Sequence, residues 1–304
     1  MIFAVKQALT LWILGDGKPG HENQSLGLAE AIGRRLSCEV YRIPASPLRD
    51  AFGAAKKFPR PDLIVAAGHS THGLLCWLAW RYRSQSVVMM RPSLPCALFD
   101  MVIAPEHDFR KSNVSNERLL MTRGAINRVK PDVAAARHGS LVLLGGPSKH
   151  HGWDVEAMRG MLREIAQRMP AIEVADSRRT PDGFFDSLDF IKARHSHDQT
   201  PQGWLAGRLA HAAEVWVTED SVSMVYEALS GGARVGVLPV PRLRENARVI
   251  LGIDRLAAEG WVSRFDEWKE SGILQLPPGV LAEADRSADW VLGRIGHLEK
   301  EVAR

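Results

Sequence analysis

Short apolar runs alternate with segments of helical periodicity along the first half of the chain. The apolar runs that predict strands lie at residues 9–14, 38–43, 63–67, 85–90, 99–104 and 119–122. The periodic segments that predict helices lie at residues 24–36 and 71–82. Runs with almost no polar residues are typical of parallel strands that are covered on both faces. The first half is therefore expected to form a sheet between layers of helices.

The pattern lapses at residues 124–140, where small and polar residues predict a linker, and then restarts. Further strands are predicted at residues 141–144, 172–175, 215–217 and 234–238, and further helices at residues 155–168, 184–194, 245–259 and 281–302. This repetition predicts an α/β fold of two doubly wound Rossmann-like domains, residues 1–130 and 131–280, followed by a C-terminal helix within residues 281–304. The loops after the strands are expected to face a central cleft.

The stretch at residues 215–241 combines a strand, a polar turn, a helix ending at Gly231 and another strand. Free backbone N–H groups at the start of that helix, beside the hydroxyls of Ser221 and Ser223, suit a phosphate. Glu227 follows about one turn later, where a carboxylate suits ribose hydroxyls. The alternative is an ordinary Asp/Ser N-cap followed by an exposed Glu.

The loop at residues 15–25 reads GDGKPGHENQS and permits close approach of a ligand to the backbone. It lacks the G-x-G-x-x-G pattern with a later acidic residue, so a nicotinamide cofactor is not predicted. His21 and Glu22, at the entry to a helix, suit a general base and its orienting partner. A tight turn with a capping Glu is the alternative.

Two loops of the second half are less specific candidates for the donor site than the stretch at residues 215–241. Residues 145–149 read GGPSK without the spacing of a P-loop, and no G-x-S-x-G elbow is present. Arg178, in the loop at residues 176–180, is suited to bind a diphosphate. An Arg in such a loop is more commonly a solvated surface charge. The three His pairs of the chain lack a third ligand, so no metal is predicted.

Composition limits the function classes. A hydrophobic content of 45% and a charged content of 24% are ordinary for a globular protein, and apolar runs are too short to span a membrane. Three scattered Cys residues and no leader-like start favour the cytoplasm.

Residues 1–138 carry 19 Lys and Arg against 11 Asp and Glu, a net charge of +8, and the remainder carries −4. A basic half is compatible with an anionic lipid or acceptor, although a solvated surface of scattered charges is the default interpretation. Without a basic tract interleaved with aromatics, nucleic acid is not expected. The segment at residues 74–82 either touches a membrane or forms a buried helix.

Five segments, in order, resemble the mitochondrial-fission ELM-type family. They are GDGKPGHENQSLGLAEAI (15–32), APEHD (104–108), LLGGPS (143–148), DSRRTP (176–181) and VTEDSVSMVYEA (217–228). That family is similar to the GT-B glycosyltransferases, such as the peptidoglycan lipid-precursor N-acetylglucosaminyltransferase. The polar loop at residues 197–205, HDQTPQGWL, departs from the Asn-Pro-Tyr-like sequence expected there, which leaves its contacts to base or sugar undefined.

The resemblance implies a GT-B-like fold with a C-terminal helix packed back on the N-terminal domain. It implies His21 or Glu22 near the reacting centre, the diphosphate at residues 221–224 and the ribose at Glu227. The nucleotide-sugar site implied in full is Gly17, Gly20, Gly146, Ser148, Arg178, Glu219, Asp220, Ser221, Val222, Ser223, Met224 and Glu227. The donor would be UDP-linked, with no cofactor or metal.

The resulting hypothesis is a metal-independent glycosyltransferase that moves a sugar to an envelope glycolipid or related acceptor. It would work in the cytoplasm, peripheral to the inner face of the membrane, and no oligomeric state is predicted. An inert GT-B-like scaffold or regulator is the main alternative, because fold does not imply function. A nucleotide-sugar epimerase is the third, and it would require a nicotinamide or paired acids.

Overall fold

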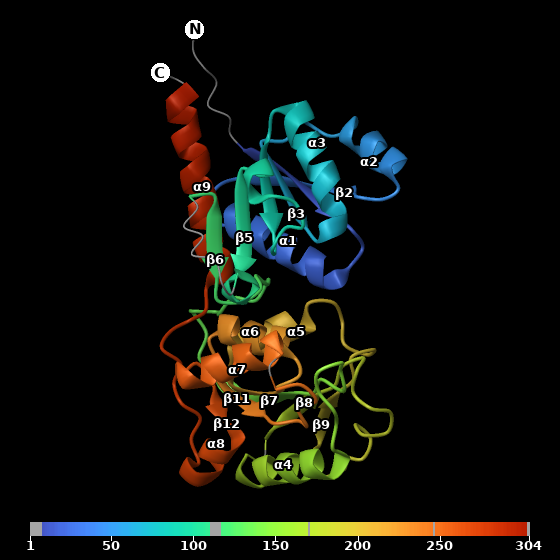
Figure 1. Ribbon diagram of the computed structural model, residues 1–304. Coiled ribbons are helices and arrows are strands. Elements are labelled where there is room, and N and C mark those ends of the chain that lie inside the picture. The colour runs from blue at the N-terminus through green and yellow to red at the C-terminus, as the bar shows by residue number, and fades with distance from the viewer. Residues whose placement is uncertain (1–7, 110–116, 170, 246, 303–304) are drawn as a thin grey trace. The chain divides into compact units, whose positions relative to one another are not determined.

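The computed structural model divides the chain into two compact units, each built on its own parallel sheet (Figure 1). Unit 1 comprises Met1–Arg128 and Ala282–Arg304, and unit 2 comprises Val129–Leu281. The structure describes residues 8–109, 117–169, 171–245 and 247–302. Within those ranges, no helix combines the length and the apolar character that crossing a bilayer requires.

The sheet of unit 1 has the strand order β2-β1-β3-β4-β5-β6, with all neighbours parallel. Its strands are β1 (Leu9–Gly15), β2 (Cys38–Pro44), β3 (Leu63–Ala67), β4 (Gln85–Met89), β5 (Met101–Pro105) and β6 (Leu119–Thr122). The strand order reverses at β1, because β2 lies on one side of it and all later strands follow on the other. Ligands of open parallel sheets bind beyond the carboxyl ends of the strands at such a switch point. The loops after β1 and β3 therefore flank the expected binding position of unit 1.

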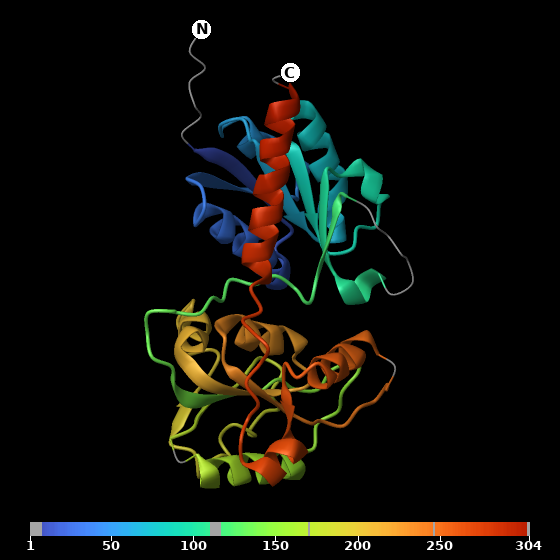
Figure 2. The ribbon, with the colours of Figure 1, turned by 90° about the vertical axis from the view of Figure 1, so that its left-hand side faces the viewer.

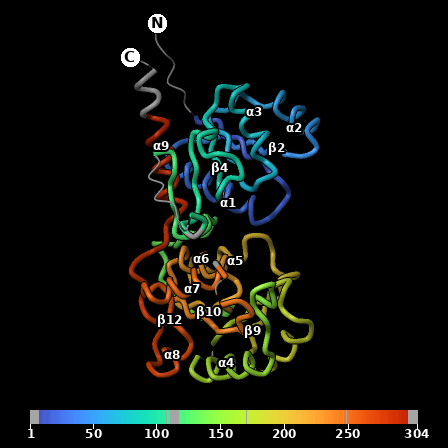
Figure 3. The backbone as a smooth tube through the Cα atoms, viewed as in Figure 1, coloured from blue at the N-terminus to red at the C-terminus, as the bar shows by residue number. Residues whose placement is uncertain are grey.

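Helices cover both faces of this sheet (Figures 1 and 3). Helices α1 (Pro19–Gly33) and α9 (Glu283–Val302) cover one face, and α2 (Leu48–Ala55) and α3 (His72–Tyr82) cover the other. The alternation of side chains along β1 supplies both layers, since Ile13 packs toward α1 and α9 whereas Trp12 packs toward α2 and α3. Three short 3₁₀ helices, η1 (His69–Thr71), η2 (Cys96–Leu98) and η3 (Glu106–Phe109), complete the unit.

Helix α9 returns from the end of the chain to pack along α1 (Figure 2). Ion pairs reinforce the apolar contact: Asp285 Oδ1 lies 2.9 Å from Arg34 Nη2 and 2.6 Å from Arg35 Nη1, and Arg35 also donates to Asp289. Burial opposes ionisation of Asp285, but hydrogen bonds from Arg35 and Arg34 hold its pKa below its ordinary value. The ionised carboxylate therefore stabilises the docked helix.

Asp285→Asn is expected to lower the free energy of unfolding at pH 7 by about 1 kcal/mol, because the lost network is partly exposed. Since the pKa of Asp285 is lowered by folding, this stabilisation is complete above about pH 4, the pKa of an unfolded aspartate. It is lost as the pH falls further, through the pKa of the folded state. Urea unfolding of both proteins at pH 7 and pH 3 measures the difference. A difference that does not change with pH would contradict a role for the charge.

The sheet of unit 2 has the order β12-β11-β10-β7-β8-β9, again with parallel neighbours. Its strands are β7 (His138–Leu143), β8 (Glu173–Ala175), β9 (Ala193–His195), β10 (Ala212–Thr218), β11 (Arg234–Leu238) and β12 (Ser263–Arg264). Read from β9, this is the 3-2-1-4-5-6 order of the classical dinucleotide-binding fold, with its switch point between β7 and β10. The loops after β7 and β10 flank that point.

Unit 2 is also layered. Helices α5 (Trp204–His211), α6 (Val222–Gly231) and α7 (Arg248–Ala258) cover one face, and α4 (Val155–Arg168) and α8 (Phe265–Ser271) cover the other. Along β10, Val215 and Val217 pack on the first layer, and Trp216 packs edge-on against Trp268 of α8 in the second. The predicted α/β class and its two doubly wound halves are confirmed.

The helix predicted at residues 184–194 is wrong. Phe184, Leu188 and Ile191 are all buried, and their spacing of four and three residues imitates one face of a helix. The segment instead forms successive turns, in which Ser187 N–H donates to the Phe184 carbonyl and Ile191 N–H to the Leu188 carbonyl, and it ends in β9. Pro181 and Gly183 just before the segment, and the Asp and Ser residues within it, favour turns over a continuous helix. Helices α2, α5 and α8 and strands β9 and β12 were not predicted.

Candidate functional site

A His–Asp pair lies at the switch point of unit 1. Asp16 follows β1, and His21 lies in the first turns of α1. Asp16 Oδ2 lies 2.9 Å from His21 Nδ1, and Ser70, after β3, donates its hydroxyl to the same oxygen at 3.2 Å. Because Nδ1–H donates to the carboxylate, the second ring nitrogen, Nε2, carries the lone pair. This is the arrangement of a general base held in one orientation.

The backbone around the pair makes room for the imidazole. Gly68 has φ +92°, and a Cβ at this position would lie 2.4 Å from His21 Nδ1. Burial opposes ionisation of Asp16, but hydrogen bonds from His21, the Lys18 N–H and Ser70 hold its pKa below its ordinary value. The carboxylate is therefore ionised at neutral pH, where it stabilises positive charge on the ring.

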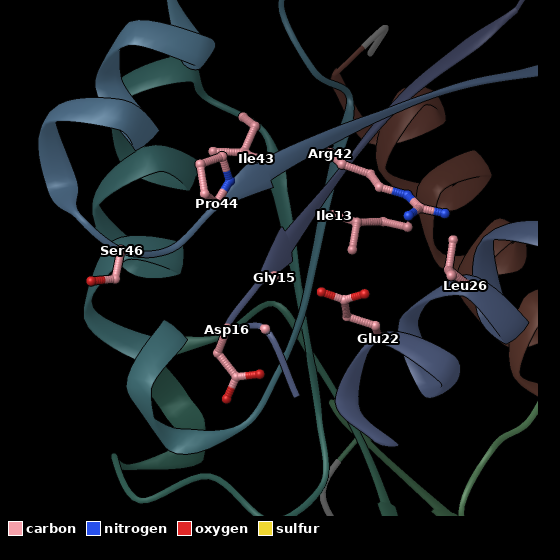
Figure 4. A pocket seen from close by; sticks show the side chains of 10 residues that line it. Ile13, Gly15, Asp16, Glu22, Leu26, Arg42, Ile43, Pro44 and Ser46 are labelled. Carbon is pink, nitrogen blue, oxygen red and sulfur yellow. The ribbon is translucent and has the colours of Figure 1, made fainter. Parts of the chain in front are cut away.

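A pocket of about 390 Å³ adjoins this pair at the ends of β1 and β2 (Figure 4). Its walls include apolar and charged side chains, among them Ile13, Leu26, Ile43, Asp16, Glu22 and Arg42. Figure 4 shows that the carboxylates of Asp16 and Glu22 point in different directions. The predicted pairing of His21 with Glu22 needs correction, because the carboxylate bonded to the ring belongs to Asp16. Glu22 remains a residue of the pocket wall.

The loops of unit 2 meet at its own switch point. The Thr218 hydroxyl oxygen accepts the Gly145 N–H at 2.7 Å, and Asp220 Oδ2 accepts the Gly146 N–H at 3.0 Å. Arg179, after β8, places Nη1 2.7 Å from Asp220 Oδ2 and donates to the Gly146 carbonyl at 2.9 Å. Three strand ends are thereby joined in one network, which brings together the predicted residues Gly146 and Asp220.

Helix α6 begins within this network and leaves its first N–H groups available. Its first internal hydrogen bond runs from the Val225 N–H to the Ser221 carbonyl, at 3.2 Å. The N–H groups of residues 222–224 therefore have no acceptor inside the helix, and these residues include the predicted Val222 and Met224. The Ser221 side chain makes no capping bond, and Ser223 is exposed. Glu227 is half-buried one turn further along α6. The Asp220 side chain joins the loops and does not act as the alternative N-cap.

Ser148 and His151 lie in the loop that follows β7. Ser148 Oγ accepts the N–H groups of His150 and His151, each at 3.2 Å, so its own hydrogen is directed to His151 Nδ1 at 3.4 Å. His151 Nε2 is then a donor, and it is buried without a partner among the residues that the structure describes, as is the acceptor Asp220 Oδ1. Burial lowers the pKa of His151 despite Glu219 and Asp220, which keeps the ring neutral at pH 7. These two atoms can still bond to a ligand or water.

Other predicted site residues have different surroundings. Glu219 is only 3% exposed and forms a bidentate ion pair with Arg242, at 3.1 and 2.9 Å, which commits its carboxylate to the loop. Arg178 is exposed, and its neighbour Arg179 enters the network instead. Gly17 and Gly20 belong to unit 1, where Gly17 lines the pocket. Across the described ranges, no three His, Cys, Asp or Glu side chains are grouped to hold a metal.

Sequence comparison identifies the family. A model of the family described as Mitochondrial fission ELM1 matches residues 19–295. The chain belongs to this family. Protein RP120 of Rickettsia prowazekii (strain Madrid E), which is uncharacterized, is 22% identical over 332 residues, covering 85% of this chain and 91% of that protein. The resemblance carried by the five sequence segments is therefore confirmed.

Solved structures show the same fold. A UDP-N-acetylglucosamine 2-epimerase matches with a TM-score of 0.59 at 13% identity, covering 97% of each chain. The Neisseria meningitidis UDP-GlcNAc 2-epimerase bound to UDP-GlcNAc has a TM-score of 0.55 at 10% identity, covering 94% of this chain and 100% of that one. Acinetobacter baumannii MurG has a TM-score of 0.51 at 11% identity, covering 95% and 99%. This ELM1-family chain thus has the predicted GT-B fold of two Rossmann-like domains.

Proposed function

We propose that the protein transfers a sugar from a nucleoside-diphosphate sugar, UDP-linked, to an acceptor hydroxyl without a metal. Unit 2 would hold the donor, and unit 1 would hold and activate the acceptor. The observation that carries the proposal is that each switch point bears a complementary set of groups. Unit 1 has an oriented base beside a pocket, and unit 2 has a helix whose first N–H groups find no acceptor within the helix.

The donor site uses hydrogen-bond donors in place of a cation. The N–H groups of residues 222–224 and the Ser223 hydroxyl would bind the diphosphate, and the positive end of the α6 dipole would stabilise it. Glu227 would accept hydrogen bonds from the ribose hydroxyls. The same donors would stabilise the charge that develops on the departing diphosphate, the largest expected contribution in such a reaction.

The transfer step follows from the geometry of the His–Asp pair. His21 Nε2 accepts the proton of the acceptor hydroxyl as its oxygen forms a bond to the anomeric carbon. The bond from that carbon to the diphosphate oxygen breaks, and its electron pair leaves with the nucleoside diphosphate. Asp16 stabilises the imidazolium, which later releases the proton to water. The anomeric configuration is inverted in such a single displacement.

An envelope glycolipid or a related anionic molecule suits the acceptor role. The first 138 residues carry the positive charge of the chain, whereas the remainder is acidic. A lipid-linked acceptor would place the protein at the cytoplasmic face of a membrane, bound peripherally. The alternating apolar and charged wall of the unit 1 pocket supports an amphipathic acceptor.

Ser223→Asp is expected to weaken UDP binding at least tenfold, because the new carboxylate repels the diphosphate. The same charge at the N-terminus of α6 should stabilise the helix by about 0.3–1 kcal/mol, so misfolding would not explain the loss. Calorimetric titration of wild type and variant with UDP, GDP, ADP and CMP measures the effect. UDP should bind wild type most tightly.

Ala157→Asp, an exposed position in the first turn of α4, is the matched control and should leave UDP affinity unchanged. Wild type that binds no nucleotide more tightly than about 1 mM, or about −4 kcal/mol, would remove the donor site from the proposal. Equal losses in the two variants would show a general charge effect and would contradict binding at α6.

Epimerisation of the nucleotide sugar is the second candidate. The observation in its favour is that Asp16 and Glu22 line one pocket next to His21, which supplies paired acids without a nicotinamide. Incubation of UDP-N-acetylglucosamine with the protein alone discriminates the two, because an epimerase converts it to the 2-epimer and transfer requires an acceptor. A nucleotide-binding protein that does neither would support the inert scaffold.

A further inference from the structure

An apolar surface lies on the outer side of α2, α3 and η2 in unit 1, and we call Phe52, Trp77, Trp80 and Leu98 the aromatic ridge. Trp77 is 44% exposed, Trp80 76% and Leu98 56%, large fractions for such side chains. On α3, Leu75 and Leu78 are fully buried toward the sheet, so the two Trp residues occupy the face away from it. Packing within unit 1 therefore leaves a large part of both Trp rings exposed.

Contacts connect the three elements that carry the aromatic ridge. The Trp77 and Phe52 rings have centroids 4.9 Å apart, which connects α3 to α2. On the other side, Cys76 Sγ lies 3.8 Å from the carbonyl oxygen of Leu98 in η2. Figure 1 shows α2 and α3 on the same side of the unit 1 sheet. The three elements that carry the ridge are therefore packed next to one another.

Basic residues border one end of the aromatic ridge. The Tyr82 hydroxyl donates to the Ala55 carbonyl at 3.1 Å, which brings the ends of α2 and α3 together. The exposed bases at those ends are Lys56, Lys57, Arg81 and Arg83, none of which has an acidic partner among the described residues. Residues 63–99 contain no Asp or Glu at all. An anionic partner is therefore favoured at this surface.

We propose that the aromatic ridge and its basic border dock unit 1 on an anionic lipid bilayer. Trp side chains prefer the interface between headgroups and acyl chains, and each nearby Lys or Arg strengthens binding to anionic lipid about fivefold. Exposed Trp and Leu side chains next to bases without an acidic partner in the described part of the chain match that layered chemistry. Docking would bring unit 1 to a lipid-linked acceptor, so the purpose of this surface rests on the proposed sugar transfer. The docking test needs no nucleotide, so the two can fail separately.

Flotation of the full chain with vesicles of phosphatidylcholine and 30% phosphatidylglycerol, at about 0.1 M salt, tests docking. Wild type should bind these vesicles at least tenfold more tightly than pure phosphatidylcholine. Lys56→Glu with Lys57→Glu should weaken binding more than tenfold, and Trp77→Ser with Trp80→Ser about tenfold. Trp fluorescence of wild type should shift to the blue on binding.

Lys192→Glu with Arg244→Glu, both exposed on unit 2, changes the net charge equally and should leave vesicle binding within twofold of wild type. Equal losses in the two charge-reversed proteins, or no binding by wild type, would overturn the proposal. If wild type is a dimer and the Trp double substitution converts it to a monomer, the aromatic ridge binds a second copy of the chain and not a bilayer.

Discussion

His21→Gln is expected to reduce sugar transfer by about 10²–10⁴-fold while leaving UDP affinity unchanged. Glutamine fills similar space but cannot accept a proton at the Nε2 position, so the acceptor hydroxyl would have to attack without a base. The donor groups belong to unit 2 and should be unaffected. Release of UDP from UDP-N-acetylglucosamine, with a total bacterial lipid extract as acceptor source, measures the rate.

His69→Gln is the matched control, because His69 is exposed in η1 after β3 and forms no hydrogen bond or ion pair with Asp16. Its transfer rate should stay within about threefold of wild type. Asp16→Asn should lower the turnover number by at least tenfold with little change in the Michaelis constant, since it alters the tautomer and orientation of His21 but not donor binding. Full activity of His21→Gln would remove the base from the mechanism.

The fold was predictable because buried parallel strands leave a strong pattern. Continuous apolar runs such as the one in β3, which is buried along its whole length, have few other meanings, and the restart after residue 140 indicated a second unit. Helix α2 escaped prediction because it has only eight residues, of which just Ala51 and Ala55 are buried. Short helices of this kind carry too little periodicity to detect.

The candidate sites were less predictable because they depend on contacts between loops. His21 was selected from its place at a helix entry, but its partner could be assigned only once Gly68 and Ser70 were seen beside Asp16. Glu22 is adjacent to His21 in the sequence and Asp16 lies five residues before it, so proximity along the chain favoured Glu22, whereas the turn brings Asp16 to the ring. The signal available was an acidic residue between the two glycines that follow β1.

The same limit applies to unit 2. Glu219 and Asp220 are adjacent, yet the first pairs with Arg242 and the second with Arg179. Adjacent side chains in an extended turn point to opposite sides, so sequence alone cannot tell which of two acids faces the loops. Arg178 and Arg179 pose the same problem: both are exposed, but the prediction selected Arg178, whereas Arg179 bonds to Asp220 and Gly146.

Gly146→Ala is expected to destabilise unit 2 by about 1–3 kcal/mol and to weaken UDP binding at least tenfold. A Cβ at this position would lie 1.7 Å from the Arg179 carbonyl oxygen and 2.8 Å from the Thr180 nitrogen. Both are backbone atoms, so the clash can be relieved only if one loop moves. That movement would separate the Gly146 N–H from Asp220 and disturb the entry to α6.

Gly207→Ala is the matched control, because it makes the same Gly-to-Ala change in the same unit without a clash. Gly207 lies within α5 of the same unit, and no atom lies within 4 Å of an added Cβ, so the substitution should be neutral or stabilise by about 0.5–1 kcal/mol. Thermal unfolding and UDP titration of both variants give the comparison. A Gly146→Ala protein that melts with wild type but loses UDP would mean that the methyl group occupies ligand space. One that melts earlier and keeps its UDP affinity would show that the network of Asp220 and Arg179 holds the fold without forming the donor site.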